Sequence, residues 1–258
     1  METLQIALDP AQSAGLVLAM TRVTAFALVS MPMGMLMPIS GRMAMGLAVG
    51  LLLAEPYEGA LSLVGLFGAA VVNAGIGVAL GWLTSIIFQI FFTSAAFLDV
   101  LSGLFAAVLF DQAMEERAGM YTRLFNMTAI ALFAVAGGLE LLVRGLGFTF
   151  EVIPVHGEIS LNAGLITETA VQTLEAMMLG AAELILPVAA ALFLVEITMG
   201  LASRFSPQTN VFLLGLPAKL LVALVLVSTS IMLFPEVMGG VMDRMEELFE
   251  VGIRAFMP

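Results

Sequence analysis

Ionisable side chains inside long apolar runs are the residues of this 258-residue chain whose type and spacing could do chemistry. Glu140, Glu183 and Glu196 lie in such runs, and Arg22 lies in the first one. A charge in hydrocarbon is costly unless it meets a partner charge or water. These groups are therefore candidates for a proton path, or they line an aqueous lumen or pair across subunits. Glu183 and Glu196 are 13 residues apart, about three and a half helical turns, so they face different ways and build no relay.

The rest of the sequence offers no catalytic or cofactor-binding set. It contains no Walker loop, no HExxH and no GxSxG motif. Its single histidine, His156, follows Pro154 in a polar connection and is expected to be a solvated loop residue. Zero cysteines and one histidine exclude a disulfide framework, an Fe–S cluster, a Cys-ligated zinc and a multi-histidine site within one chain. We therefore expect no enzyme, no cofactor and no metal.

A membrane must position these groups, because the chain is too apolar for water. Apolar residues make up 61% of it and charged residues 11%, whereas a soluble domain has about half and about a quarter. Twenty acids against nine bases give a formal charge of −11, the wrong sign for binding the phosphates of nucleic acid. Residues 1–10 carry two acids and no base, so no signal peptide is expected.

Charges and prolines divide the chain into apolar stretches at about 11–31, 43–54, 59–98, 100–110, 124–143, 176–203 and 205–235. A bilayer core of roughly 30 Å needs about 20 helical residues. The run between Glu58 and Asp99 holds 40 uncharged residues, roughly 60 Å of helix. We expect two helices there, bent within the glycine-rich part 75–81. The stretch 43–54 is too short to span alone and indicates a half-span or a re-entrant hairpin.

Two further patterns concern helix packing. Gly46 with Gly50, and Gly77 with Gly81, have the small-xxx-small spacing of closely packed membrane helices, within or between subunits. In the C-terminal piece 236–258, apolar residues recur at helical spacing between charged ones. This predicts an amphipathic helix lying on a surface or docked on a partner. With no tandem repeat and no low-complexity linker, we treat the whole chain as one domain.

A methionine-rich segment follows the first apolar run. Met31, Met33, Met35 and Met37 alternate along the chain, and two prolines interrupt the segment, so we expect an extended stretch rather than a helix. Methionine is flexible and polarizable, so it can conform to a changing neighbour. The segment is therefore either a compliant seal or apolar filler in a kinked corner.

The stretch 204–219 reads RFSPQTNVFLLGLPAK and concentrates polar and helix-breaking residues. Its two prolines, with a glycine before the second, interrupt a simple helix, and its polar side chains can satisfy the backbone groups left free. The lysine lies between two apolar blocks, where its amine must reach water, a carboxylate or backbone carbonyls. A re-entrant hairpin fits this pattern better than a kinked span with a snorkelling lysine. The defining residues are Pro207, Asn210, Gly215, Pro217 and Lys219.

This motif, extended as SPQTNVFLLGLPAKLLVALVL, resembles the C-terminal signature of the FliR/SctT family of type III export-gate subunits. Weaker similarities, in the order of the family, cover most of the chain. They are Arg22 with Pro32, the stretch 42–48 with Pro56, the Phe110–Asp111 pair, and the connection from Phe148 to Gly157. The sequence departs from the family pattern at Gln112, where the family has a proline.

The resemblance implies an all-α membrane protein of broken and hairpin-paired helices in a helical hetero-oligomeric export gate, without catalysis. The implied partners are FliP-like and FliQ-like subunits, which form a protein-conducting channel with it, an FlhB-like subunit, and unfolded export substrates in transit. Carried over, Leu109, Phe110 and Asp111 belong to a loop that plugs the closed pore, and the methionines at 31–37 are candidates for a seal. The implied location is the bacterial inner membrane, at the flagellar basal body.

A proton-coupled small-molecule transporter is the alternative from another class. The three glutamates in apolar runs and the Pro/Gly-broken segment before Lys219 fit such a protein, although no visible repeat relates the two halves of the chain. Removal of the glutamates would abolish transport but would only modulate a gate. Flagellar and injectisome gates need the same physical parts, so the residues leave that choice open.

Overall fold

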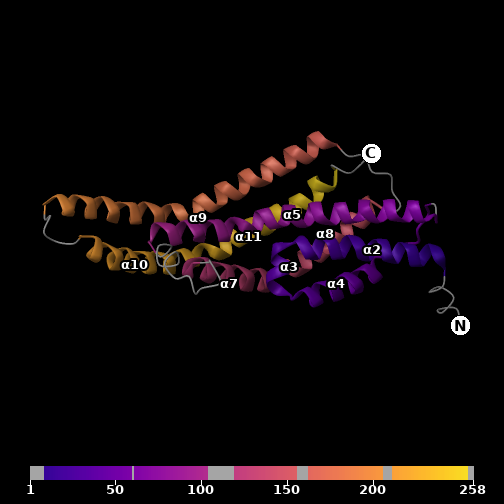
Figure 1. Ribbon diagram of the computed structural model, residues 1–258, viewed down its shortest axis with the longest axis horizontal. Coiled ribbons are helices and arrows are strands. Elements are labelled where there is room, and N and C mark those ends of the chain that lie inside the picture. The colour runs from indigo at the N-terminus through magenta and orange to yellow at the C-terminus, as the bar shows by residue number, and fades with distance from the viewer. Residues whose placement is uncertain (1–8, 60, 104–118, 156–161, 206–210, 255–258) are drawn as a thin grey trace. The chain divides into compact units, whose positions relative to one another are not determined.

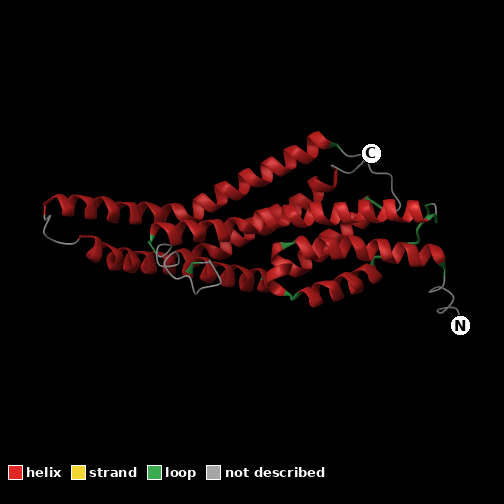
Figure 2. Cartoon of the chain, in the orientation of Figure 1, coloured by secondary structure: helices red, strands yellow, loops and turns green. Residues whose placement is uncertain are grey.

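The computed structural model describes residues 9–59, 61–103, 119–155, 162–205 and 211–254. Within these ranges the regular elements are all helices and no strand occurs, as Figure 1 and Figure 2 show. In chain order they are α2 (Pro10–Val29), α3 (Met31–Leu36), α4 (Ile39–Leu52), α5 (Leu63–Leu101), α7 (Met120–Val135), α8 (Gly138–Val152), α9 (Ala163–Phe205), α10 (Val211–Ser230), a 3-10 turn (Ile231–Leu233) and α11 (Phe234–Arg254). The all-α prediction is confirmed.

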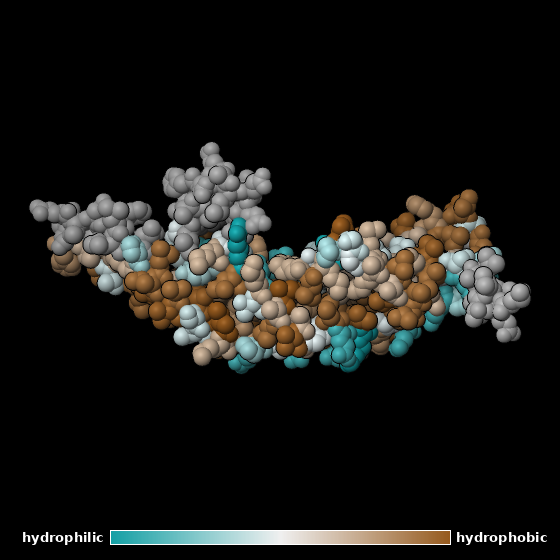
Figure 3. All heavy atoms as spheres, turned by 90° about the horizontal axis from the view of Figure 1, so that it is seen from below, coloured by the Kyte–Doolittle hydropathy of each residue, from teal (hydrophilic) through white to brown (hydrophobic). Residues whose placement is uncertain are grey.

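Several of these helices are long and apolar enough to cross a membrane. The helices α2, α5 and α9 qualify, as does the stretch Pro217–Val251, and α7 with α8 would form a fifth, broken span. Many large apolar side chains on them are exposed, and much of the face in Figure 3 is apolar. Soluble proteins rarely expose such continuous apolar surface, so the chain is an integral membrane protein. The 14 residues of α4 reach only about 21 Å, too short for a span, as predicted.

The 40-residue uncharged run forms one helix and not the two that we expected. The helix α5 runs unbroken for 39 residues, about 58 Å. Its glycines do not interrupt it, and the space they leave is used for packing: a Cβ at Gly77 would collide with the carbonyl of Arg22, and one at Gly81 with that of Phe26. Both neighbours lie on α2 and advance in step with the glycines, so the two helices run parallel. A helical glycine here marks close approach and not a break.

The described residues fall into two compact units, one within the ranges Met1–Phe88, Phe133–Glu175 and Val241–Pro258, the other within Gln89–Leu132 and Ala176–Gly240. In the first unit, α2 and α4 form an antiparallel hairpin. Gly46 of α4 lies against Thr24 of α2, and Gly50 lies against Met20, so the partner's number falls as the glycine's rises. Both small-xxx-small pairs of the sequence therefore pack inside the chain, and both pack against α2, one from α4 and the other from α5.

In the second unit, α9 and α10 run antiparallel. Gly215 of α10 faces the side chain of Met199 on α9, and Lys219, one turn later, reaches back to Glu196. Polar contacts also join α5 to α9, since the Ser94 hydroxyl donates to the carbonyl of Ala181 at 3.1 Å. The aromatic core of this unit consists of Phe91 and Phe125, whose ring centroids lie 5.2 and 4.8 Å from that of Phe234.

The helix α11 is amphipathic, with its charged residues gathered on one side. Within the first unit, Met245 and Phe249 on its apolar side are buried, and the Phe249 ring centroid lies 6.0 Å from that of Phe26 on α2. Gly145 of α8 leaves the room that the Phe249 ring occupies. We expected this apolar side to lie on an outer surface or a partner, but the chain's own α2 and α8 cover it.

Candidate functional site

The residues assigned to a pore plug, Leu109, Phe110 and Asp111, lie outside the described residues. So do two of the five defining residues of the C-terminal motif, Pro207 and Asn210, and the single histidine, His156. The structure does describe the helices on either side of these segments. The polar contacts of those helices therefore define the candidate site.

Asp99, near the end of α5, holds the start of α7. Its carboxylate accepts hydrogen bonds from the backbone N–H of Tyr121 and of Thr122, both at 3.0 Å, and from the Thr122 hydroxyl at 2.6 Å. The first N–H groups of a helix have no partner within it, and a carboxylate at that end also meets the positive end of the helix dipole. Gly119 lies so close to this carboxylate that a Cβ there would clash with it. The two helices flanking residues 104–118 are thus hydrogen-bonded to each other.

Sequence reasoning missed this role of Asp99, which we used only as the end of an uncharged run. Its partners lie 22 and 23 residues further along the chain. No local sequence pattern connects an acid at the end of α5 to a cap on α7, because known capping motifs involve residues only a few positions apart. Only the threonine and glycine at the start of an apolar helix could have suggested an incoming partner.

Met31, Met33 and Met35 lie in the helix α3, so the prediction of an extended stretch was wrong for them, whereas Met37 at the C-cap is extended. Pro32 falls in the first turn of α3, where a proline costs no hydrogen bond. Helical geometry spreads the methionines around the turn: Met33 is fully buried and Met35 is exposed. Met31 anchors the corner, because its N–H donates to the hydroxyl of Ser85 on α5 at 2.8 Å. Whether Met31, Met33, Met35 and Met37 seal a pore stays a prediction.

Arg22 is the centre of a buried polar cluster in the first unit. Its Nε donates to Oδ1 of Asn73 at 2.9 Å, and its Nη1 donates to the carbonyl of Thr149 at 3.0 Å. The guanidinium also lies 4.3 Å from the ring centroid of Phe150, within the range of a cation–π contact. Asn73 in turn donates to the carbonyl of Val155 at 3.1 Å. This cluster ties α2 and α5 to the C-terminal end of α8, whose dipole favours a positive charge.

Lys219 has a carboxylate partner, one of the three that its position between apolar blocks allowed. Its Nζ lies 3.1 Å from Oε1 of Glu196, with the two side chains 18% and 61% exposed. Pro217 lies inside α10 and does not end it. Together with Gly215 against Met199, this ion pair forms one seam between antiparallel helices. The described part of the motif is therefore one arm of a helical hairpin; whether the hairpin is re-entrant stays a prediction.

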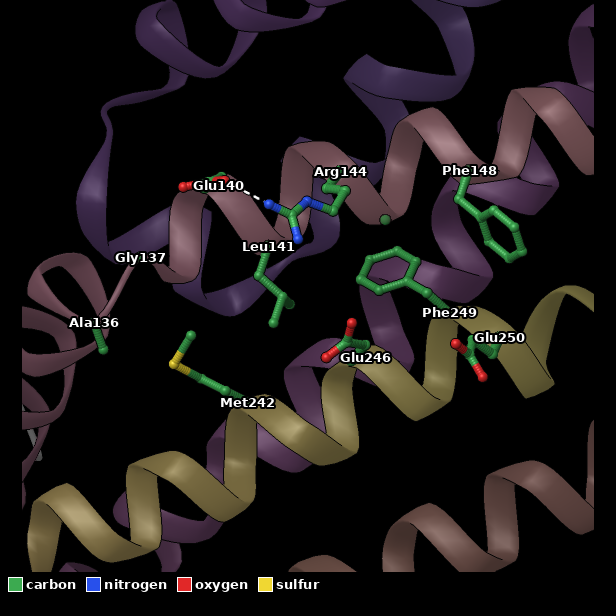
Figure 4. A pocket seen from close by; sticks show the side chains of 11 residues that line it. Ala136, Gly137, Glu140, Leu141, Arg144, Phe148, Met242, Glu246, Phe249 and Glu250 are labelled. Carbon is green, nitrogen blue, oxygen red and sulfur yellow. Dashed lines mark hydrogen bonds and ion pairs between the residues drawn. The ribbon is translucent and has the colours of Figure 1, made fainter.

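A cavity of about 370 Å³ lies between α8 and α11 in the first unit. Figure 4 shows Glu140 and Arg144 joined along α8 across from the acids of α11; the Oε1–Nη2 distance is 2.6 Å, and both side chains are exposed. The cavity lining consists of Ala136, Gly137, Glu140, Leu141, Arg144, Gly145, Phe148, Met242, Glu246, Phe249 and Glu250. The lining thus combines an exposed ion pair of α8 and two carboxylates of α11 with apolar side chains.

The three glutamates that the sequence grouped differ in their interaction partners. Glu140 and Glu196 are each held in an ion pair with a base of the chain. Glu183 is exposed on α9, and no hydrogen bond or ion pair joins it to another described residue. In the described part of the chain, no group of three His, Cys, Asp or Glu residues could hold a metal ion. The ion pairs give Glu140 and Glu196 partners within their own units.

Known proteins of bacterial export are similar to this chain. It is 28% identical over 153 residues to the flagellar biosynthetic protein FliR of Escherichia coli (strain K12), a match that covers 59% of this chain and 58% of FliR. It is 24% identical over 153 residues to the surface presentation of antigens protein SpaR of Shigella flexneri, with the same coverage. It is 22% identical over 182 residues to FliR of Aquifex aeolicus (strain VF5), covering 70% and 69%. The match spans 58% of the length of each of the first two relatives.

A family-wide comparison covers more of the chain than these pairwise matches. The sequence pattern of the bacterial export proteins, family 1, matches residues 14–245. This range includes the described contacts of Arg22, Asp99 and Lys219. The resemblance to the FliR/SctT family is thereby confirmed, and the chain belongs to the bacterial export proteins, family 1.

Proposed function

We propose that this chain is a structural subunit of a type III export gate in the bacterial inner membrane, acting without catalysis or a cofactor. In the gate it forms part of a protein-conducting channel with FliP-like and FliQ-like subunits, and an FlhB-like subunit binds the assembly. The observation that carries the proposal is the family match across residues 14–245. The names of the relatives, which refer to flagellar biosynthesis and to surface presentation of antigens, support it.

The length of α5 gives this proposal independent physical support. Phe67 and Phe97 are both exposed on it and lie 30 residues apart, about 45 Å along a helix. The hydrocarbon core of a bilayer is only about 30 Å thick, and tilts beyond about 40° are exceptional. Lipid therefore cannot cover both rings at an ordinary tilt, so at least one of them needs protein neighbours. A subunit of a larger assembly meets this need.

Within this gate, the segment that contains Leu109, Phe110 and Asp111 is proposed to plug the closed pore. The hydrogen bonds of Asp99 support this role, because they fix the helices on both sides of the segment. The methionines at 31–37 are proposed to contribute to a seal, with Met35 on the exposed side of α3.

Assembly tests the proposed function directly. The full chain would be expressed with and without FliP-like and FliQ-like subunits from the same organism, and extracted in mild detergent. We expect a stable hetero-oligomer, identified by native mass spectrometry, only when all three are present. Recovery of the chain as a free monomer from cells that contain both partners would contradict the proposal.

The plug makes a separate prediction. Replacing Leu109 and Phe110 with glycine removes two large apolar side chains, which should widen the closed channel and raise the leakage of small solutes through cells that carry the assembled gate. A matched control replaces Leu51 and Leu52, exposed at the end of α4, with glycine and should leave permeability unchanged. Equal leakage from the two double variants would argue against a plug at this position.

A further inference from the structure

Of the three glutamates in apolar runs, Glu183 is the one with no partner charge among the described residues. Its two fellow intramembrane glutamates are paired with Arg144 and Lys219, whereas Glu183 is exposed on α9. One turn before it and one turn after it, Leu179 and Leu186 are also exposed. A single carboxylate therefore interrupts an otherwise apolar face of a helix that is long enough to cross a membrane.

The backbone adds a second unsatisfied acceptor at the same point. In an α-helix the carbonyl of residue 183 would accept from the N–H of residue 187. Residue 187 is Pro187, inside α9, and proline has no N–H. Glu183 thus presents both its carboxylate and its own carbonyl oxygen without the donors that each normally has.

Two acceptors of one residue on an apolar face determine what can cover them. Lipid tails offer no donor, and a carboxylate near the middle of a membrane helix costs about 2.5–3.5 kcal/mol. A neutral donor such as a serine can serve one acceptor, but it does not balance the charge. A lysine ammonium with three donors, or an arginine guanidinium with five, can serve both acceptors and neutralise the acid.

We infer that Glu183 is an inter-subunit contact that binds a Lys or Arg side chain of a neighbouring gate subunit. That side chain projects from a helix with apolar residues on either side, which pack on Leu179 and Leu186. The inference rests on the proposed function, because it needs a partner within the membrane. It assigns a partner chemistry to the α9 face of the second unit, and it gives Pro187 a role in freeing an acceptor.

Two substitutions with a matched control test the inference in the full chain, expressed with its gate partners. Glu183→Leu would fit a lipid-facing position better than the native acid, and Glu183→Lys would place like charges together. The control is the same pair of changes at Glu168, which lies in the first unit, near the start of α9 and outside the long apolar run. The readout is the hetero-oligomer recovered in mild detergent, divided by the full-length chain present in the membrane, so that poor insertion is not mistaken for poor assembly.

Both Glu183 variants should assemble at least about tenfold less well, because removing one partner of a desolvated charge pair leaves the other unpaired. Both Glu168 variants should stay within about twofold. A change of a basic to an acidic residue in a partner subunit should restore assembly of Glu183→Lys. Assembly of Glu183→Leu at or above the native level would place the face in lipid and overturn the inference.

Water in a lumen is the remaining alternative, and the chain is suited to test it because it contains no cysteine. Glu183→Cys introduces a unique thiol, which a membrane-impermeant maleimide labels only where water reaches it. We expect no label on this chain in the assembled gate, and rapid labelling would overturn the inference. The native chain separates the two proposals: if it fails to assemble, the proposed function fails, whereas normal assembly of every Glu183 variant would refute this contact alone.

Discussion

Among the described residues, each of the two compact units contains one buried charge, and the two charges are of opposite sign. In the first unit the cation Arg22 is met by oxygen atoms of Asn73 and Thr149 and by the ring of Phe150. In the second unit the anion Asp99 is met by two backbone N–H groups and a hydroxyl of the next helix. The first cluster joins α2, α5 and α8, and the second joins α5 to α7. Neither cluster relies on an ion pair between side chains.

The units differ in how their helices approach one another. In the first, glycines bring the backbones of α4 and α5 against α2, and the contacts leave no room for a Cβ. In the second, the seam between α9 and α10 is made by long side chains, with Met199 over Gly215 and Lys219 reaching Glu196. Close backbone packing specifies one arrangement, while long side chains can adapt to a neighbour. We interpret the first unit as a rigid scaffold and the second as the unit that binds a neighbouring subunit through Glu183.

The largest effect on stability is expected from Arg22→Met, which tests the scaffold. Methionine fills similar space but leaves the Asn73 oxygen without its donor and takes one of two donors from the Thr149 carbonyl, which keeps the N–H of Ile153. A buried acceptor left unsatisfied costs about 1–3 kcal/mol and a hydrogen bond from a charged group contributes about 1.5–3 kcal/mol, so the free energy of unfolding should fall by about 3 kcal/mol. Denaturant titration of the purified chain in detergent measures this loss.

The control for this variant is Arg144→Met, whose ion pair with Glu140 is exposed, and it should cost less than about 0.5 kcal/mol. Adding Asn73→Leu to Arg22→Met removes the orphaned amide and should recover part of the loss, because neighbours in one network are coupled. Equal stability of Arg22→Met and the native chain would show that the cluster is not a structural centre.

A smaller effect is expected from Asp99→Ala, which tests the anion of the second unit. The start of α7 loses its cap, and a lost cap costs up to about 2 kcal/mol. Hydrogen exchange at the amides of Tyr121 and Thr122 should accelerate, because their acceptor is gone, while exchange elsewhere in the unit changes less. Asp243→Ala, at an exposed position of α11, should leave that exchange as it is. Unchanged protection at these two amides would argue against the capping role.

The sequence predicts well what depends on local composition. The membrane character of the chain, the shortness of the stretch predicted at 43–54 and the amphipathic character of α11 follow from apolar length and period. It also marks Gly46, Gly50, Gly77 and Gly81 as packing residues, although the same glycines led to the false expectation of a bend in α5. A glycine pattern predicts that two helices approach closely, but whether the glycines interrupt their helix depends on the helix that packs against them, which lies elsewhere in the chain.

What the sequence cannot predict are contacts between distant residues. Asp99 finds its N–H donors on the next helix, and Asn73 links Arg22 to Val155, pairs that no spacing relates. The prediction for the methionine segment was wrong for a different reason. Alternation and prolines indicate an extended chain, but a proline in the first turn of a helix is compatible with helical backbone, and α3 uses Pro32 in that way.

The smallest effect on the chain itself is expected from Lys219→Met. Its partner Glu196 is largely exposed, and such pairs contribute about 0.2–1 kcal/mol, comparable to the average polar contact between membrane helices. The variant should therefore unfold within about 1 kcal/mol of the native chain, and the further change Glu196→Gln should bring it closer still. A loss well above that range would mean that the pair is buried in the working protein, with another subunit covering Glu196. Measuring the variant alone and with its gate partners separates these cases, because only the assembled form would then show the larger loss.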